Sequence, residues 1–408
     1  FQLVAINEAA ILLLRRYEAY SRLPDLDHAL ALCQKAVART PVDVPERAAI
    51  LNNWGAGLRI RYALTGKVED LDAAINVHKD ALTHTPANSP ERTQNLNNLG
   101  IGLRERYELT KRQEDLDAAI ATWHDAVAFT PADSPDRARR LNNLGIGLRT
   151  RYELTGQLED LDAAIATCEA AAACALASSP ERASILSNLG TGLSIRYARS
   201  GRPEDIDAAI VAYKDAISHT PAYDANRAGH LNNLALGLHV RYARMGQPAD
   251  LDAAINAWQE ALARTPTDSS DQTIYLTNLG NGLRARYART GQPADLAAAI
   301  TAYLNAVART PDDSPDRAAN LNNLSTGLID RYARTGRPED LEAAIAALED
   351  TVALTRDDSP GRAMYLNNLG AGLQARYART GRLEALEAAL AAYKNSIAHT
   401  TVDWSERA

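Results

Sequence analysis

Cysteine and histidine are the side chains of this sequence best suited to metal or nucleophilic chemistry. The chain has 8 His and 3 Cys, and a zinc site needs about four such ligands at characteristic short spacings. Cys33 is isolated, and Cys168 and Cys174 lie six residues apart, so on a helix they do not share a face. No spacing of His or Cys therefore predicts a metal site, and we expect no cofactor.

Glycine-rich and acidic motifs are the other candidates for chemistry. The segment Asn-Leu-Gly-Ile-Gly-Leu around Gly100 resembles a phosphate loop, but no strand precedes it and it lies within an expected helix. Acid pairs such as Glu69 and Asp70 recur at expected helix starts, where they complement the helix dipole. Arg61, in the last turn of the preceding helix, is expected to pair with them. We therefore predict that the chain is not an enzyme.

The composition is that of ordinary soluble globular protein with few large side chains. Apolar residues make up 46% and aromatic residues only 5%, which favours many small interfaces over one large core. The net charge of −7 without a basic patch predicts no nucleic-acid partner. The sequence lacks an apolar run of about 18 residues and a signal peptide, so we expect no membrane contact. Sparse cysteines favour a reducing, cytoplasmic (intracellular) location.

A repeat of constant length must position any functional residue. The string Leu-Asn-Asn-Leu-Gly, or a close variant, recurs every 45 residues, and a degenerate copy starts at Ile6. A fixed period of this size indicates a solenoid. The eight clear copies start at Leu51, Leu96, Leu141, Leu186, Leu231, Leu276, Leu321 and Leu366.

The period predicts a single solenoid domain, 1–408, of nine repeats. Because the chain begins and ends at the same phase of the period, we expect it to be a piece of a longer protein. The repeats are expected at about 1–44, 45–89, 90–134, 135–179, 180–224, 225–269, 270–314, 315–359 and 360–408.

One repeat shows how a helical hairpin is specified. Ser134 and Pro135 suit the N-cap and first position of a helix, and Gly156 suits its left-handed end. A second helix opens at Glu159 and Asp160 and, in most copies, closes at Thr-Pro. The apolar residues of the first helix fall at spacings of three and four, on one helical face: Leu141, Leu144, Leu148 and Tyr152. The sequence thus predicts an all-α fold of nine antiparallel helix-turn-helix units.

The repeat resembles the tetratricopeptide repeat family over essentially the whole chain. The residues that match its pattern in one copy are Leu96, Leu99, Gly100, Ala119, Trp123, Ala126 and Pro131. The period departs from the family's usual length of about 34. The long form is similar to arrays of fungal and bacterial NLR-like and CHAT-associated signalling proteins, and Leu-Asn-Asn-Leu is similar to kinesin light chain repeats. The resemblance implies a right-handed superhelix with a concave face formed by the first helices.

Comparison of the copies separates fixed positions from varied ones on the first helix. The fixed core face holds Leu96, Leu99, Gly100, Leu103 and Tyr107. A second fixed stripe holds Asn98, Gly102 and Arg106. A mid-helix Gly costs about 1 kcal/mol against Ala, so we expect close approach of the next hairpin at Gly102, with Asn98 satisfying polar groups there. The alternative is a polar ladder that binds a ligand backbone.

The third face of the first helix varies, as a recognition surface on a rigid scaffold would. The alternative is that exposed positions simply drift. In tetratricopeptide proteins these positions line the inner groove. The candidate partner-binding residues on this face and its border are Asn52, Ala56, Arg59, Ile60, Gln94, Asn97, Ile101, Arg104, Glu105, Arg139, Asn142, Ile146, Arg149, Asn232, Leu236, His239, Asn281, Arg284, Asn322 and Asn367.

Four arginines, Arg59, Arg104, Arg139 and Arg149, make the predicted groove basic toward its N-terminal half. One hypothesis is an acidic partner. The alternative is neutralisation within the helix, because Arg104 and Arg149 each precede a Glu by four residues.

These patterns predict a protein- or peptide-binding scaffold, the sensor or partner-recognition arm of a larger signalling protein. The alternative function is a regulatory solenoid that binds a small molecule or controls an adjoining catalytic domain. End-to-end self-association is also expected, because terminal repeats normally carry polar outer faces and the first repeat has Ala9, Leu12 and Leu13.

Overall fold

The computed structural model describes residues 2–41, 44, 46–86, 89–179 and 181–405. Every regular element among these residues is an α-helix, which confirms the predicted all-α class. Contacts divide the chain into two compact units, Phe1–His219 and Thr220–Ala408. The boundary falls between two hairpins, so each unit consists of whole repeats. That all the repeats act as one domain stays a prediction.

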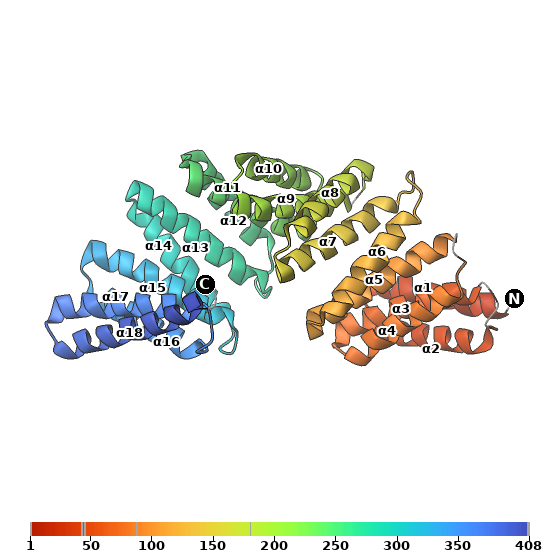
Figure 1. Ribbon diagram of the computed structural model, residues 1–408, viewed down its shortest axis with the longest axis horizontal. Helices are drawn as coiled ribbons and strands as arrows, with labels where there is room; N and C mark the ends of the chain where they lie inside the picture. The colour runs from red at the N-terminus through yellow and green to blue at the C-terminus, as the bar shows by residue number, and fades with distance from the viewer. Residues whose placement is uncertain (1, 42–43, 45, 87–88, 180, 406–408) are drawn as a thin grey trace. The chain divides into compact units, whose positions relative to one another are not determined.

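Unit 1 contains ten helices within the described residues, paired as consecutive hairpins (Figure 1). The helices are α1 (Gln2–Tyr20), α2 (Leu23–Arg39), α3 (Glu46–Thr65), α4 (Val68–Thr83), α5 (Pro90–Thr110), α6 (Gln113–Ala128), α7 (Arg137–Thr155), α8 (Leu158–Cys174), α9 (Glu181–Ser200) and α10 (Pro203–Ser218).

Unit 2 contains eight helices in its described part, paired in the same way. They are α11 (Asn226–Met245), α12 (Pro248–Arg264), α13 (Asp271–Thr290), α14 (Pro293–Arg309), α15 (Asp316–Thr335), α16 (Pro338–Leu354), α17 (Arg362–Thr380) and α18 (Leu383–Ser405). Within a unit, each even-numbered helix also packs against the first helix of the next hairpin, so the core is continuous along the stack.

The core faces lie where the repeat pattern predicts them. Leu99 and Leu103 of α5 pack with Leu116 and Trp123 of α6, and all four side chains are buried. The small residue Ala119 lets the two helices approach, and it is fully buried. Helix α7 begins at Arg137 rather than at the predicted Pro135, because residues 131–137 form two successive turns closed by Ser134 N–Pro131 O and Arg137 N–Ser134 O bonds of 3.1 Å each.

An arginine near the start of most first helices caps the previous hairpin, a role that the sequence analysis missed; in α13 Gln272 donates the equivalent bonds to Leu262 O and Thr265 O at 3.3 and 2.7 Å. Arg137 Nη1 donates to the carbonyl oxygen of Val127, in the last turn of α6, at 3.1 Å and to that of Thr130, just after the helix, at 2.6 Å. The same bonds are made by Arg47, Arg92, Arg182, Arg317 and Arg362. The recurrence of Arg at this phase of the period was the available signal.

Mid-helix glycines are required by the neighbouring hairpin, as predicted. A Cβ added at Gly102 would lie 3.1 Å from Cγ1 of Ile75 in the preceding hairpin, and one at Gly282 would lie 2.6 Å from Cζ3 of Trp258. Both distances are tighter than ordinary van der Waals contact, so the backbone of the first helix of one hairpin packs directly against the second helix of the hairpin before it.

Asparagine side chains connect successive hairpins in a ladder. Asn98 Nδ2 donates to Asn52 Oδ1 of the preceding repeat at 2.9 Å. The same bond joins Asn143 to Asn97, Asn188 to Asn142, Asn278 to Asn232 and Asn368 to Asn322, at 2.8–3.0 Å. The Asn98 stripe is therefore part of the inter-repeat packing, which confirms the structural interpretation of that stripe.

A bidentate arginine–aspartate clamp closes the turn between the two helices of a hairpin in every hairpin but the last. Arg151 Nε and Nη2 donate to the two carboxylate oxygens of Asp160 at 2.8 and 2.6 Å, and Nη1 reaches Asp117 of the preceding hairpin at 3.3 Å. The clamp recurs as Arg16–Asp25, Arg61–Asp70, Arg106–Asp115, Arg196–Asp205, Arg241–Asp250, Arg286–Asp295 and Arg331–Asp340. The expected pairing of Arg61 is confirmed, and the hydrogen bond from Arg61 lowers the pKa of Asp70.

The clamp is expected to stabilise the hairpin mainly through its buried carboxylate. Asp160→Ala should lower the free energy of unfolding by about 1 kcal/mol, since two charge-assisted bonds to a partly exposed arginine are lost. Asp117→Ala removes only the longer bond to an exposed carboxylate and should change stability by less than about 0.5 kcal/mol. Urea unfolding of both variants measures the difference, and equal losses would contradict this ranking.

Candidate partner-binding site

The predicted partner-binding residues lie mostly in a half-buried position on the first helices. Leu236 and Asn367 are exposed, and Asn97, Asn232 and Asn322 are buried. The half-buried members are Asn52, Ala56, Arg59, Ile60, Gln94, Ile101, Arg104, Glu105, Arg139, Asn142, Ile146, Arg149, His239, Asn281 and Arg284.

Three asparagines of the predicted set are too deep to line a groove. Asn97 is 0% exposed, and Asn232 and Asn322 are each 8% exposed. Their Oδ1 atoms accept the ladder bonds from the next repeat, and Asn232 Oδ1 also accepts the indole N–H of Trp258 at 3.1 Å. Their prediction as groove residues is wrong, because the hydrogen bonds between hairpins draw these side chains into the interface.

The basic groove predicted in unit 1 is neutralised by carboxylates. Arg104 and Arg149 pair with Glu108 and Glu153 at 3.2 and 2.6 Å, as the alternative interpretation predicts. Arg139 pairs with Asp136 at 2.7 Å.

Arg59 pairs across repeats with Glu105 at 2.9 Å, a contact that the sequence analysis missed. Burial raises the pKa of Glu105 despite this arginine. The pair lies on the predicted groove face, so that face of unit 1 carries an internal ion pair there rather than a free positive charge.

A cavity of about 450 Å³ opens on the predicted face in unit 2. It brings together three predicted site residues, His239 of α11 and Asn281 and Arg284 of α13. Arg284 Nε donates to Asp330 Oδ2 of α15 at 2.6 Å, so an ion pair joins two successive first helices at the cavity. The remaining lining residues are Ala285, Tyr287 and Ala288.

Aromatic residues of the second helices hold the polar side chains of the cavity in place. Tyr303 Oη donates to Asn281 Oδ1 at 2.8 Å. The His239 ring lies edge-on to Trp258, with ring centroids 5.7 Å apart. Burial lowers the pKa of His239, so the imidazole is neutral at pH 7. The cavity therefore presents polar groups whose positions are fixed before any ligand arrives.

Exposed apolar side chains flank this cavity. Leu236 and Val240 of α11 are 39% and 41% exposed, and Ile274 of α13 is 53% exposed. Leu236 lies three residues before His239, and Ile274 lies seven before Asn281, so each shares the helical face of a cavity residue. Val240 lies four residues after Leu236, on the same side of α11 as that leucine. In unit 1 the apolar members Ile60 and Ile101 instead pack against the core clusters.

The described part of the chain contains neither a candidate metal site nor a candidate membrane-spanning helix. The described residues contain no group of three or more His, Cys, Asp or Glu side chains placed to hold a metal ion. None of the described helices has the length and apolarity needed to cross a membrane.

Neither a protein-family model nor a curated protein sequence matches the chain. Among solved structures, "Human IFIT1 dimer with PPP-AAAA" matches with a TM-score of 0.51 at 15% identity, over 96% of this chain and 81% of that one. The nearly identical TPR-like repeats of a putative kinesin light chain from Podosopora anserina match with a TM-score of 0.39 at 17% identity, over 52% of this chain and 96% of that one. The C-terminal part of a TPR repeat-containing protein from Cytophaga hutchinsonii matches with a TM-score of 0.47 at 13% identity, over 77% of this chain and 99% of that one.

Identities this low establish a fold and not a function. The fold itself is independently visible in the chain, where hairpins of two helices follow one another at a constant period and share a continuous core within each unit. From its constant period and its paired helices, the described chain therefore has the fold of a tetratricopeptide-like α-solenoid, in an extended 45-residue form of the repeat.

Proposed function

We propose that the chain is a protein-binding scaffold that holds an extended peptide segment on the first-helix face of unit 2. The observation that carries the proposal is the cavity beside His239, Asn281 and Arg284, flanked by exposed apolar side chains. Contiguous exposed apolar surface beside fixed polar groups is characteristic of interaction sites. We infer that this surface serves as the sensor or partner-recognition arm of a larger signalling protein, without catalysis of its own.

The chemistry of the surface suits a peptide with apolar side chains. Leu236, Val240 and Ile274 would bury two or three such side chains of the partner, each stabilising the complex by about 1 kcal/mol or more. Asn281 and the neutral His239 would hydrogen-bond the peptide backbone, which carries one donor and one acceptor per residue. Because Arg284 already pairs with Asp330, a strongly charged peptide gains little at this cavity.

We also propose that the partner is a protein rather than a nucleic acid. Binding to phosphate backbones needs unpaired Lys or Arg on a common face. On the first-helix face Arg59, Arg104, Arg149 and Arg284 each have a carboxylate partner within 3.2 Å. A structural match was solved with PPP-AAAA, so RNA is a direct comparison for the experiment below.

A small-molecule ligand is the second candidate, favoured by the size of the cavity. Its volume of about 450 Å³ falls within the range of about 300–1,000 Å³ usual for small-molecule sites. Its lining includes an ion pair and few apolar side chains, which suits such a ligand less well than a peptide that also covers Leu236 and Ile274. In this alternative the solenoid would regulate an adjoining domain through the bound molecule.

Selection from a random peptide library displayed on phage tests the proposal. Peptides enriched on the full chain should contain two or more apolar residues and bind with micromolar Kd. The double variant Leu236→Glu/Ile274→Glu should weaken binding at least about tenfold, or about 1.4 kcal/mol. Fluorescence anisotropy with a labelled selected peptide measures the affinity. A labelled triphosphorylated oligoadenylate is measured in the same way, as the nucleic-acid comparison.

A matched control distinguishes specific binding at this face from non-specific binding to any exposed apolar side chain. Leu304 of α14 is 51% exposed and lies on a second helix, so Leu304→Glu should leave binding unchanged. Equal losses in the two variants, or tighter binding of the oligoadenylate than of any peptide, would contradict the proposal. If only small molecules raise the thermal stability, the second candidate is supported.

End-to-end self-association remains a prediction with its own surfaces. Leu12 of α1 is 62% exposed, and Leu390 and Ile397 of α18 are 50% and 62% exposed. Light scattering at increasing concentration should show a rising mean mass, and Leu12→Glu/Ile397→Glu should remove the rise. A constant monomer mass in the unaltered chain would end this idea.

A further inference from the structure

The last hairpin breaks the arginine–aspartate clamp that the other hairpins share. At the position of Asp340 in the preceding hairpin, the last one has Ala385, which is 4% exposed. Arg376 is the clamp arginine of this hairpin, and within the described chain its Nε and Nη2 atoms have no hydrogen-bond partner. Only Nη1 is engaged, by Glu342 of the preceding hairpin at 3.4 Å. The two donors that elsewhere hold a carboxylate are therefore free here.

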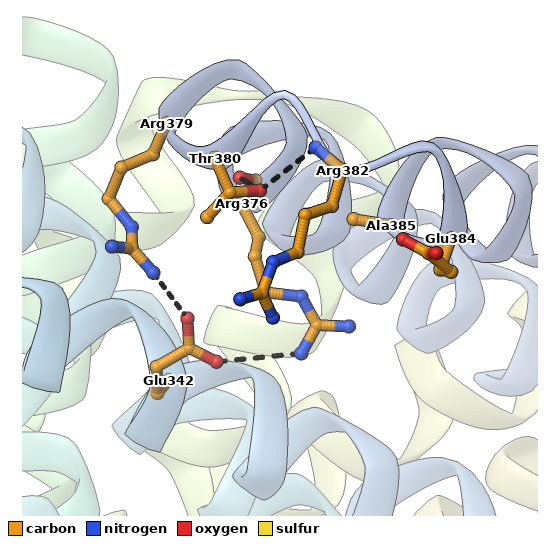
Figure 2. Close-up of a pocket in the computed structure, with 7 residues that line it drawn as sticks. All are labelled: Glu342, Arg376, Arg379, Thr380, Arg382, Glu384 and Ala385. Atoms are coloured by element: carbon orange, nitrogen blue, oxygen red, sulfur yellow. Dashed lines mark hydrogen bonds and ion pairs between the residues drawn. The ribbon is translucent and has the colours of Figure 1, made fainter.

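A cavity of about 750 Å³ lies where the missing carboxylate would be. Figure 2 shows its lining, in which Arg379 and Arg376 both reach Glu342, at 2.9 and 3.4 Å. Arg382 also lines it, and no hydrogen bond of its guanidinium is found among the described residues. The Asp-to-Ala difference between the repeats removes the carboxylate that would occupy the part of this cavity next to Arg376, while the arginine is retained.

The charges of the cavity favour an anion. Three guanidinium groups line it, against the two carboxylates of Glu342 and Glu384, which leaves an excess of one positive charge. Ala385 lies in the first turn of α18, whose N-terminal end adds partial positive charge. Two of the arginine side chains are only about one-third exposed, 30% for Arg376 and 33% for Arg379, so an ion pair formed with Arg376 is partly shielded from water.

We propose that this cavity is a binding site for an external carboxylate, which takes the place of the missing Asp side chain. The Nε and Nη2 donors of Arg376 would bond its two oxygens in the bidentate geometry seen at Arg331–Asp340, at 2.9 and 2.6 Å. Arg382, which also lines the cavity, would add a third donor. This cavity shares no lining residue with the cavity beside His239, Asn281 and Arg284. The carboxylate proposal is therefore independent of the peptide proposal.

Restoring the internal carboxylate is the decisive variant. Ala385→Asp should rebuild the clamp, occupy the donors of Arg376 and raise the melting temperature. Arginine Nε–Hε NMR resonances are recorded while sodium succinate or an acetylated, amidated Asp-Asp dipeptide is added at constant ionic strength. The Arg376 resonance, assigned by its loss in Arg376→Gln, should shift and saturate in the unaltered chain, and should respond at least about tenfold more weakly in Ala385→Asp.

The two probes also distinguish the sources of the carboxylate. Tighter binding of the dipeptide points to an acidic protein segment, and equal binding points to a small free carboxylate; both outcomes support the site. An Arg376 resonance that does not move, or that moves equally in Ala385→Asp, would overturn the proposal. A larger response to inorganic phosphate than to either carboxylate would overturn the assignment of the ligand class.

Discussion

Lowering the pH from neutral to about 4 is expected to destabilise the protein by about 3 kcal/mol through His78 alone. His78 is 1% exposed, and both ring nitrogens lack a hydrogen-bond partner among the described residues. Burial, with a smaller contribution from Arg59, lowers its pKa from 6.5 to about 4. The shift of about 2.5 units corresponds to about 3 kcal/mol at 1.36 kcal/mol per unit.

The sign follows from which state binds the proton. Above pH 6.5 His78 is neutral in both states, and its burial carries no ionisation penalty. As the pH falls below 6.5, the unfolded chain binds a proton that the folded chain does not, so stability is lost until the folded pKa is reached near 4. Below that pH the folded state is protonated as well, and the loss stops growing.

Comparison with His78→Tyr isolates this effect from the other titrating groups. The same position holds Tyr213, Tyr303 and Tyr393 in other hairpins, where the ring also packs on a glycine of the first helix. Urea unfolding at pH 7 and at about pH 4 should show the variant losing about 3 kcal/mol less than the unaltered chain. His124→Gln, at an exposed position of α6, should behave like the unaltered chain. Equal acid sensitivity in all three proteins would contradict the account.

Gly282→Ala is expected to lower the free energy of unfolding by about 2 kcal/mol, although Ala is the better helix former by about 1 kcal/mol. The new Cβ would lie 2.6 Å from Cζ3 and 3.2 Å from Cε3 of Trp258. Trp258 is fully buried, and its indole N–H is bonded to Asn232 at 3.1 Å. The ring cannot withdraw without loss of that bond, so the hairpins must separate.

Gly229→Ala is the matched control, in a first helix of the same unit. A Cβ at Gly229 would meet only Tyr275 Oη, at 3.9 Å, so this variant should stabilise α11 by about 0.5 kcal/mol. Thermal unfolding followed by circular dichroism measures both changes, with Gly282→Ala below and Gly229→Ala slightly above the unaltered chain. A Gly282→Ala protein as stable as the control would show that close approach of the hairpins does not require this glycine.

The helical hairpins, and the helical faces through which they pack, could be predicted from the sequence. The constant period with Leu99, Gly102 and Trp123 at fixed phases determines which faces meet, because helical geometry converts spacing into direction. The pairing of Arg61 with the acids of the next helix followed from the same geometry. These features recur in nearly all of the hairpins, so one local pattern describes them.

The depth and partners of the varied positions could not be predicted from one helix at a time. Asn97 is drawn inward by a bond from Asn143, and Arg59 is neutralised by Glu105, contacts between residues 46 apart. Both depend on how successive hairpins stack, which the spacing within a helix does not determine. The cavity beside Arg376 could have been found from the sequence, because Ala385 stands where the other copies have Asp. The residues shared by all copies do not indicate such a difference in a single copy.

Site-specific photo-crosslinking of a selected peptide tests the central claim that the first-helix face of unit 2 binds the partner. Benzoylphenylalanine placed at Ala285, which lines the cavity, should capture the peptide in a yield that free peptide competes away. The same probe at Leu304, on the second helix of that hairpin, should capture little. Capture from Leu304 with none from Ala285 would show that the peptide binds elsewhere.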